Sequence, residues 1–170
     1  ILNTCAVTNE AERKSRQCIS RCLKFNESAK VVVCGCASQN NAEQFYQKQG
    51  VVYVIGNAQK GKLADKLQES GILVSPLPRE YEDDFCADVV RTRAYVKIQD
   101  GCDNYCSYCL IPYVRGRSRS RSIDSVVGEC GRLQNISREI ILTGIDISSY
   151  GKNINSDLPA LIRALSGIKC

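Results

Sequence analysis

The stretch "AYVKIQDGCDNYCSYC" (residues 94–109) joins a predicted strand directly to a loop with three cysteines. Apolar and polar side chains alternate over residues 94–99, which is the period of a β-strand. The segments that follow repeat the pattern, with helices expected over residues 122–134 and 157–167 and a strand over 138–144. Such a series predicts parallel strands in an α/β fold, whose active-site loops follow the carboxyl ends of the strands. The three cysteines therefore lie where such folds build their active sites.

The first half of the chain alternates in the same way. Its first helix is expected to be capped by Asn9, which forms a capping-box pattern with Glu12. Short apolar runs that end in glycine are typical of buried parallel strands. We expect helices over residues 9–25 and 59–71 and strands over residues 29–36 and 50–57.

A change of composition separates the two halves. Residues 73–93 contain two prolines and a cluster of four acidic residues, which is typical of a linker. We therefore predict a first domain at 1–74, a linker at 75–91 and a second domain at 92–170. The second domain is much shorter than the roughly 250 residues of a complete eight-unit barrel. The chain also contains no Met and begins within a predicted strand, so we expect an internal fragment.

The eleven cysteines and the absence of histidine restrict the possible chemistry. Without histidine, Ser-His and Cys-His nucleophiles are excluded within this chain, as is every zinc site with a histidine ligand. The cysteines are odd in number and clustered, which favours metal-binding thiolates in a reducing compartment over a secreted disulfide framework. No apolar run approaches the roughly 18 residues needed to span a bilayer. We therefore expect a soluble, cytoplasmic protein with no membrane partner.

Cys102, Cys106 and Cys109 have the spacing C-x3-C-x2-C. Three thiolates on one loop can hold three corners of a [4Fe-4S] cluster, and with no fourth cysteine nearby the remaining iron stays open. An open coordination position is typical of catalytic metal sites. The alternatives are a structural zinc site completed from elsewhere in the chain, or three unrelated thiols.

Basic side chains gather beside this loop. The net charge is +5, and residues 91–121 alone hold seven basic side chains against two acidic ones. Arg117, Arg119 and Arg121 stand at every second position, so an extended segment would align them along one side, where guanidinium groups suit phosphate oxygens. The alternative is a flexible, solvated loop. We predict that these three arginines, with Arg115, contact a polyanionic partner, which the resemblance described below implies is RNA.

Five motifs resemble, in the same order, those of the methylthiotransferases, which are radical S-adenosylmethionine (SAM) enzymes that modify tRNA or a ribosomal protein. The first motif has the form typical of the branch that acts on N6-threonylcarbamoyladenosine at position 37 of tRNA and makes its 2-methylthio derivative. The branches for isopentenyladenosine and for the ribosomal protein typically diverge just after "NTC". The motifs are "NTCAVTNEAERKSRQ" (3–17), "CGCASQ" (34–39), "GCDNYCSYCLIPYVRG" (101–116), "SR" (120–121) and "ILTGIDISSYG" (141–151).

The resemblance implies a partial flavodoxin-like domain followed by the first βα units of a TIM-type radical SAM barrel. Cys102, Cys106 and Cys109 would hold one [4Fe-4S] cluster, whose open iron binds SAM for reductive cleavage to the 5'-deoxyadenosyl radical. Tyr108 would lie near the adenine of SAM. Thr143 and Gly144, at the end of the second strand, would contact SAM. The implied partners are tRNA, SAM and a reductant such as flavodoxin or ferredoxin.

The resemblance also implies a second, auxiliary [4Fe-4S] cluster held by three cysteines. Cys5 and Cys36 match two of its ligands, and the third normally precedes the "NTC" motif. Cys34 is the obvious substitute, but we expect it to be a buried strand residue. The remaining rival is a non-catalytic iron-sulfur or zinc module that binds RNA. Three other cysteines, Cys18, Cys22 and Cys130, are expected to pack in helix cores. Cys86 in the linker and Cys170 have no assigned role.

Overall fold

The computed structural model describes residues 1–82 and 92–169. The chain packs into two compact units, Ile1–Leu77 with Cys106–Arg115 and Pro78–Tyr105 with Gly116–Cys170. The cysteine loop is therefore shared between the units, with Cys102 in the second unit and the other two thiols in the first. Cys86, Arg91 and Cys170, like most of the predicted linker, lie outside the described residues.

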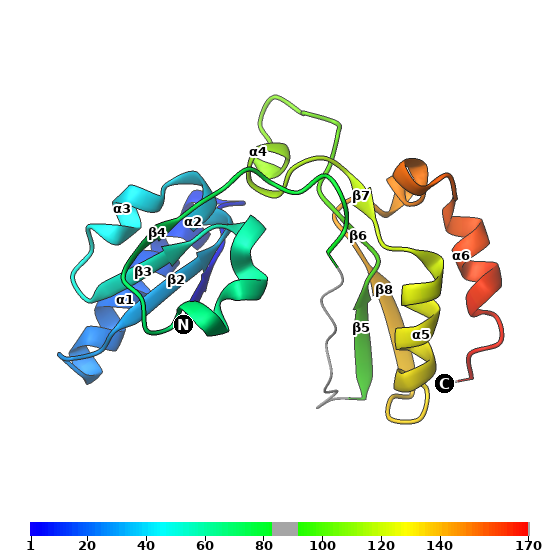
Figure 1. Ribbon diagram of the computed structural model, residues 1–170, viewed down its shortest axis with the longest axis horizontal. Coiled ribbons are helices and arrows are strands. Elements are labelled where there is room, and N and C mark those ends of the chain that lie inside the picture. The colour runs from blue at the N-terminus through cyan, green and yellow to red at the C-terminus, as the bar shows by residue number, and fades with distance from the viewer. Residues whose placement is uncertain (83–91, 170) are drawn as a thin grey trace. The chain divides into compact units, whose positions relative to one another are not determined.

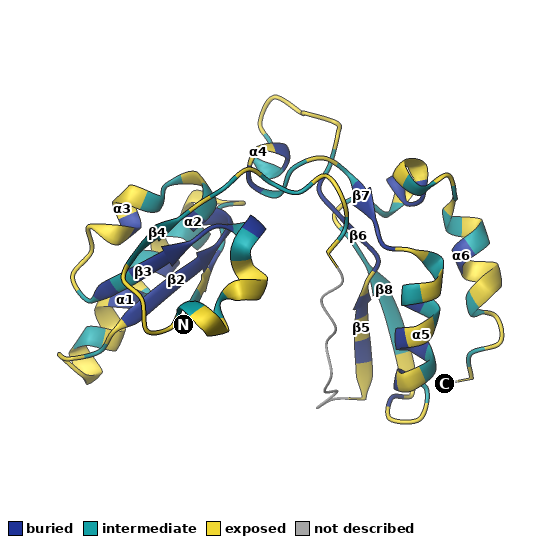
Figure 2. Cartoon of the chain, viewed as in Figure 1, coloured by how far each residue is buried: buried dark blue, intermediate teal, exposed yellow. Residues whose placement is uncertain are grey.

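The first unit contains a parallel four-stranded sheet (Figure 1). Each strand pairs with the next one along the chain, and the register joins Leu2 to Val33 and Val33 to Val54. Figure 2 shows the two central strands buried, as the apolar runs predict. The strands are β1 (Leu2–Thr4), β2 (Val31–Gly35), β3 (Val51–Ile55) and β4 (Gly71–Leu73).

Helices α1 (Asn9–Phe25) and α3 (Ala42–Tyr46) pack against this sheet through a few buried side chains. Ile19 of α1 packs in one core with Phe45 of α3 and the central strands. Two further helices, α2 (Cys36–Asn40) and α4 (Ile111–Arg115), are short. Helices α2 and α3 were not expected, because five residues are too few to show a helical period.

The expected helix over residues 59–71 is wrong. Two 3-10 segments, η1 (Asn57–Lys62) and η2 (Ala64–Lys66), occupy this region, and Gly71 opens β4 instead of ending a helix. The segment has few apolar side chains to bury, and Gly61 lowers its helix propensity. Of the two leucines in this segment, only Leu63 packs against the small core formed by buried side chains of β2 and β3.

The second unit contains a parallel βαβ arrangement, as the sequence predicts. β5 (Arg93–Lys97) pairs in parallel with β8 (Glu139–Thr143), and α5 (Ile123–Leu133) lies between them in the chain. Figure 1 shows α6 (Leu158–Leu165) beside α5, and both helices contribute to one core with Val96. Short segments complete the unit: β6 (Gln99–Asp100) pairs antiparallel with β7 (Arg119–Ser120), and η3 (Ile147–Ser149) and η4 (Lys152–Ile154) precede α6.

The structure therefore confirms a mixed α/β fold with parallel strands. No helix within residues 1–82 and 92–169 is long and apolar enough to cross a membrane.

Helix α1 is capped by Thr8, so the predicted cap at Asn9 is wrong by one residue. The Thr8 hydroxyl accepts a hydrogen bond from the Ala11 N–H at 3.1 Å, and the Thr8 carbonyl accepts from Glu12 at 3.1 Å. The side chain at position 8 therefore satisfies a backbone donor that the first turn leaves unpaired.

Thr8→Ala is expected to lower the free energy of unfolding of the chain by about 1 kcal/mol, because it removes the capping acceptor. Asn9→Ala serves as the matched control, with a smaller expected loss. Urea denaturation followed by circular dichroism measures both variants. An equal or larger loss from Asn9→Ala would contradict the assignment of Thr8 as the cap.

Candidate functional site

The loop that carries the three cysteines begins at a glycine that no other residue can replace without strain. Gly101 has φ +73°, and a Cβ atom there would lie 2.0 Å from the carbonyl oxygen of Arg117. The next residue, Cys102, is half-buried and donates its N–H to the Gly116 carbonyl at 3.1 Å. Together with the β6–β7 pairing, these contacts close the base of the loop in the second unit.

The other two thiols lie in a tight turn in the first unit. The Cys109 N–H donates to the Cys106 carbonyl at 2.9 Å, and Tyr105 just before the turn has a left-handed φ of 45°. Cys106 is exposed and Cys109 is half-buried. All three cysteines of the C-x3-C-x2-C motif carry free thiols. In the described part of the chain, no three Cys, Asp or Glu side chains gather closely enough to hold a metal ion. The role of Cys102, Cys106 and Cys109 as metal ligands stays a prediction.

The residues expected to contact SAM belong to different units. Tyr108 is 89% exposed and belongs to the cysteine turn of the first unit. Thr143 ends β8 in the second unit, where its carbonyl accepts from the Ile98 N–H at 2.9 Å. Gly144 follows at once, and a Cβ atom there would lie 3.0 Å from the side chain of Gln99. The carboxyl end of β8 is thus packed closely against the segment that leads into the cysteine loop.

Gln99 is a residue near the site whose importance the sequence patterns do not indicate. Its side chain is fully buried, and its amide nitrogen donates to the Gly101 carbonyl at 2.8 Å and to the Ser118 hydroxyl at 3.0 Å. Its amide oxygen accepts from the Asp146 N–H at 2.8 Å. One side chain therefore joins the start of the cysteine loop, its return segment and the loop after β8. The only signal in the sequence is a polar side chain at the end of the predicted strand.

Asp146 places a carboxylate near the same loop. Hydrogen bonds from the hydroxyls of Ser148 and then Ser149 hold the pKa of Asp146 below its ordinary value. Asn104 of the cysteine loop donates to the same carboxylate at 3.4 Å. The loop after β8 therefore carries an ionised group at neutral pH.

Cys5 and Cys36 follow the carboxyl ends of adjacent strands in the first unit. Thr4 pairs with Gly35 in the parallel register, so the two cysteines come directly after paired residues. The Thr4 hydroxyl donates to the Cys34 carbonyl at 2.7 Å and accepts from the Ser38 N–H at 3.2 Å. This hydroxyl ties the end of β1 to both sides of Cys36.

Cys34 and Cys36 are both buried but have different surroundings. The Cys34 thiol donates to the side-chain oxygen of Asn3 at 3.8 Å, and burial raises the pKa of this thiol. The Cys36 sulfur accepts from Arg115 Nε at 3.2 Å and from Asn57 Nδ2 at 3.6 Å. Cys34 is thus the buried strand residue that was expected, whereas Cys36 has polar donors directed at its sulfur.

The other cysteines are only partly as expected. Cys130 is buried in the core of the second unit, as predicted. Cys22 is exposed and Cys18 half-buried, so the prediction that both pack in a core is wrong for Cys22. The buried stripe of α1 runs through Ser15 and Ile19, and its last turns carry mainly exposed side chains.

Two of the four arginines predicted to contact RNA are buried and do not lie on the surface. Arg119 is 7% exposed and pairs with Asp100 at 3.2 Å, and Arg121 is 1% exposed and pairs with Glu129. The carboxylates of Asp100 and Glu129 balance the charges of these two buried side chains. Arg117 is exposed.

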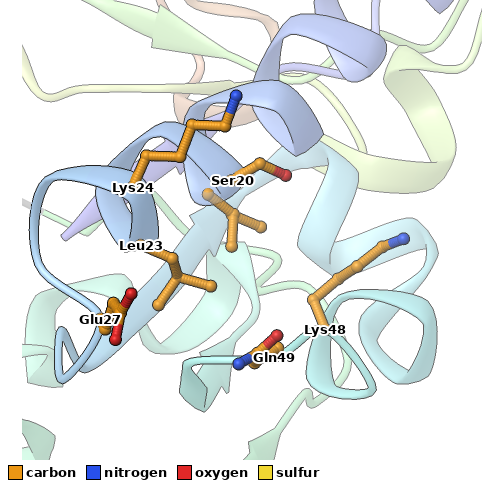
Figure 3. A pocket seen from close by; sticks show the side chains of 7 residues that line it. Ser20, Leu23, Lys24, Glu27, Lys48 and Gln49 are labelled. Atoms are coloured by element: carbon orange, nitrogen blue, oxygen red, sulfur yellow. The ribbon is translucent and has the colours of Figure 1, made fainter.

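A pocket of about 590 Å³ lies elsewhere in the first unit (Figure 3). The second half of α1 and the turn before β3 form its walls. Because this turn precedes β3, the pocket lies at the opposite end of the strand from the carboxyl ends that lead to Cys5 and Cys36. Its lining residues are Ile19, Ser20, Leu23, Lys24, Glu27, Lys48 and Gln49.

Comparisons with known proteins show which proteins the chain resembles. Residues 1–56 match the model described as "Uncharacterized protein family UPF0004". The chain is 37% identical to the threonylcarbamoyladenosine tRNA methylthiotransferase MtaB of Rickettsia prowazekii, over 94% of this chain and 38% of that protein. The chain is thus similar, over nearly its whole length, to methylthiotransferases.

Other relatives show similar relationships. The threonylcarbamoyladenosine tRNA methylthiotransferase MtaB of Bacillus subtilis is 36% identical over 91% of this chain and 36% of its own length. The tRNA-2-methylthio-N(6)-dimethylallyladenosine synthase of Syntrophobacter fumaroxidans is 34% identical over 96% of this chain and 40% of its own length. The chain thus spans about two fifths of the length of these curated methylthiotransferases.

The ion pair between Arg121 and Glu129 predicts a large effect on stability. Arg121→Ala is expected to lower the free energy of unfolding by about 3–5 kcal/mol, because it leaves the buried Glu129 without its counter-charge. The double variant Arg121→Met, Glu129→Leu is expected to lose much less, because both charges are removed together. Urea denaturation of the two variants measures the difference. A double variant as unstable as Arg121→Ala would contradict this explanation.

Proposed function

We propose that the chain is part of an enzyme that transfers a methylthio group to C2 of N6-threonylcarbamoyladenosine at position 37 of tRNA. The observation that carries this proposal is the C-x3-C-x2-C loop at the carboxyl end of β5, in a chain that is similar to methylthiotransferases. Relatives from several organisms are threonylcarbamoyladenosine tRNA methylthiotransferases by name. The similarity to the dimethylallyladenosine synthase supports isopentenyladenosine as the second candidate substrate.

The fold assignment forms part of this proposal. The parallel sheet of the first unit is consistent with a partial flavodoxin-like domain. The parallel β5–α5–β8 arrangement is consistent with the first units of a TIM-type radical SAM barrel. In such a barrel, the loops after β5 and β8 lie on the catalytic face.

Cys102, Cys106 and Cys109 would hold a [4Fe-4S] cluster. The donor set fits this group, because three free thiols stand on one short loop and three thiolates leave one iron open. When bound, such a cluster supplies the electron for reductive cleavage of SAM. The reductant that returns an electron to the cluster would be a protein such as flavodoxin or ferredoxin.

The residues around the loop would position the cofactor and the substrate. Gln99 holds the start of the cysteine loop against the loop after β8. Thr143 and Gly144 would contact SAM at the end of β8, and exposed Tyr108 would reach its adenine. The difficult bond cleavage belongs to the cofactors, and the protein supplies orientation and shielding.

Cys5 and Cys36 would contribute to an auxiliary [4Fe-4S] cluster in the first unit. Both follow the carboxyl ends of paired parallel strands, so one ligand set can draw on both loops. The third ligand would come from a segment before the "NTC" motif, as in the family.

Metal content and SAM cleavage test the proposal. After anaerobic reconstitution, the triad is expected to bind about four irons, and dithionite with SAM is expected to release 5'-deoxyadenosine. The triple variant Cys102→Ala, Cys106→Ala, Cys109→Ala should lose this iron and this activity. Cys22→Ser is the matched control, because Cys22 is exposed and has no expected ligand role. Stoichiometric zinc without SAM cleavage would favour a non-catalytic RNA-binding module.

Arg117 is the arginine of the predicted row that is exposed and able to reach a phosphate. Arg117→Ser is expected to weaken tRNA binding and to reduce the slope of log affinity against log salt by about 1. The matched control is Arg138→Ser, at an exposed position just before β8, at the opposite end of that strand from Thr143. Filter binding over a range of salt concentrations measures the slope. An unchanged slope for Arg117→Ser would contradict a phosphate contact.

A further inference from the structure

The sulfur of Cys36 is surrounded differently from that of Cys34, the other buried cysteine of the first unit. Cys36 is only 3% exposed, yet two nitrogen donors are directed at its sulfur. Arg115 Nε lies 3.2 Å away and Asn57 Nδ2 lies 3.6 Å away. Cys34, two residues earlier, instead acts as the donor, toward Asn3. The surroundings of Cys36 therefore supply hydrogen-bond donors suited to an electron-rich sulfur.

A neutral thiol is a weak acceptor, so this arrangement needs an explanation. Arginine carries its charge at every accessible pH, and its N–H groups form their strongest hydrogen bonds with anionic acceptors. A thiolate, and equally a thiolate bound to iron, is such an acceptor. The guanidinium of Arg115 and the amide of Asn57 thus complement Cys36 in its ligand form.

Helix α4, which ends in Arg115, is itself held close to Asn57. Asn57 Nδ2 also donates to the Val114 carbonyl at 2.6 Å, and Pro112 and Val114 of α4 are buried. Helix α4 follows directly after Cys109 in the chain. The turn with Cys106 and Cys109 therefore continues into the helix whose last residue contacts Cys36.

We propose that Arg115 and Asn57 are positioning residues for Cys36, which donate N–H···S hydrogen bonds to its sulfur when Cys36 ligates the auxiliary cluster. This inference rests on the proposed function. Hydrogen bonds to cluster sulfurs stabilise the more negative, reduced form and so raise the reduction potential. Through the Arg115–Cys36 contact, helix α4, which follows Cys109 in the chain, is joined to a proposed ligand of the auxiliary cluster.

The first test uses the chain without a cluster. In the ¹⁵N spectrum, the Arg115 Nε–H is expected to exchange slowly with water and to have a shifted resonance. Cys36→Ala is expected to abolish the slow exchange, whereas Cys34→Ala is expected to leave it in place. An Arg115 Nε–H that is insensitive to Cys36→Ala would overturn the contact on which the inference depends.

The second test measures the reduction potential of the auxiliary cluster. The background is the triple variant of Cys102, Cys106 and Cys109 in a chain that also carries the segment before the "NTC" motif, which would supply the third ligand. The only iron that remains is then that of the auxiliary cluster. Arg115→Ala is expected to shift the midpoint potential to a more negative value, and Arg115→Lys, which retains the charge, to give a smaller shift. Arg13→Ala is the matched control, because Arg13 is exposed on α1 and pairs with Glu10.

The outcomes separate this inference from the proposed function. An unshifted potential in Arg115→Ala, or a triple-variant background that binds no iron, would overturn the inference. Neither result would affect iron binding and SAM cleavage by the triad, which test the proposed function independently. A potential that shifts with Arg115 but not with Arg13 supports the positioning role.

Discussion

Parallel strand pairing is the constraint on which both candidate sites depend. In a parallel pair, the carboxyl ends lie at the same edge, so the loops that follow them are brought together. The pairing of Thr4 with Gly35 does this for Cys5 and Cys36 in the first unit. The pairing of β5 with β8 does the same for the start of the cysteine loop and the residues after Thr143 in the second. Each site thus draws on segments that are far apart in the sequence.

Buried polar side chains hold these loops in place. The Gln99 side-chain amide donates to one loop through its nitrogen and accepts from another through its oxygen. Arg121 forms an ion pair with Glu129 and donates to the hydroxyl of Ser125. The Tyr150 hydroxyl donates to the Arg121 carbonyl at 2.8 Å, and burial raises the pKa of this tyrosine. Within the described residues, every buried side-chain nitrogen and oxygen has a hydrogen-bond partner. Because an unpaired buried polar group is costly, these contacts specify one arrangement of the loops.

The cysteines show how surroundings assign different roles to one residue type. Cys34 and Cys130 are buried strand and helix residues, and Cys106 is an exposed thiol in a turn. Cys36 is buried like the first two but has nitrogen donors around its sulfur. Burial in apolar surroundings disfavours the charged form of a thiol, whereas nitrogen donors stabilise it. The hydrogen-bond donors around a buried sulfur therefore distinguish a candidate ligand from a structural cysteine better than the degree of burial does.

The sequence alone determined the strands around Val33 and Val96, the helices over 9–25 and 122–134, and the spacing of the three-cysteine motif, because these depend on local periods and local motifs. It did not determine the 3-10 turns near Leu63, whose few apolar side chains carry a weak periodic signal. Only the tertiary structure decided that Arg119 and Arg121 are buried, that Gln99 joins two loops, and that Arg115 meets Cys36. The partners of these side chains lie in segments remote in sequence, and charge and exposure cannot be inferred until those segments pack together.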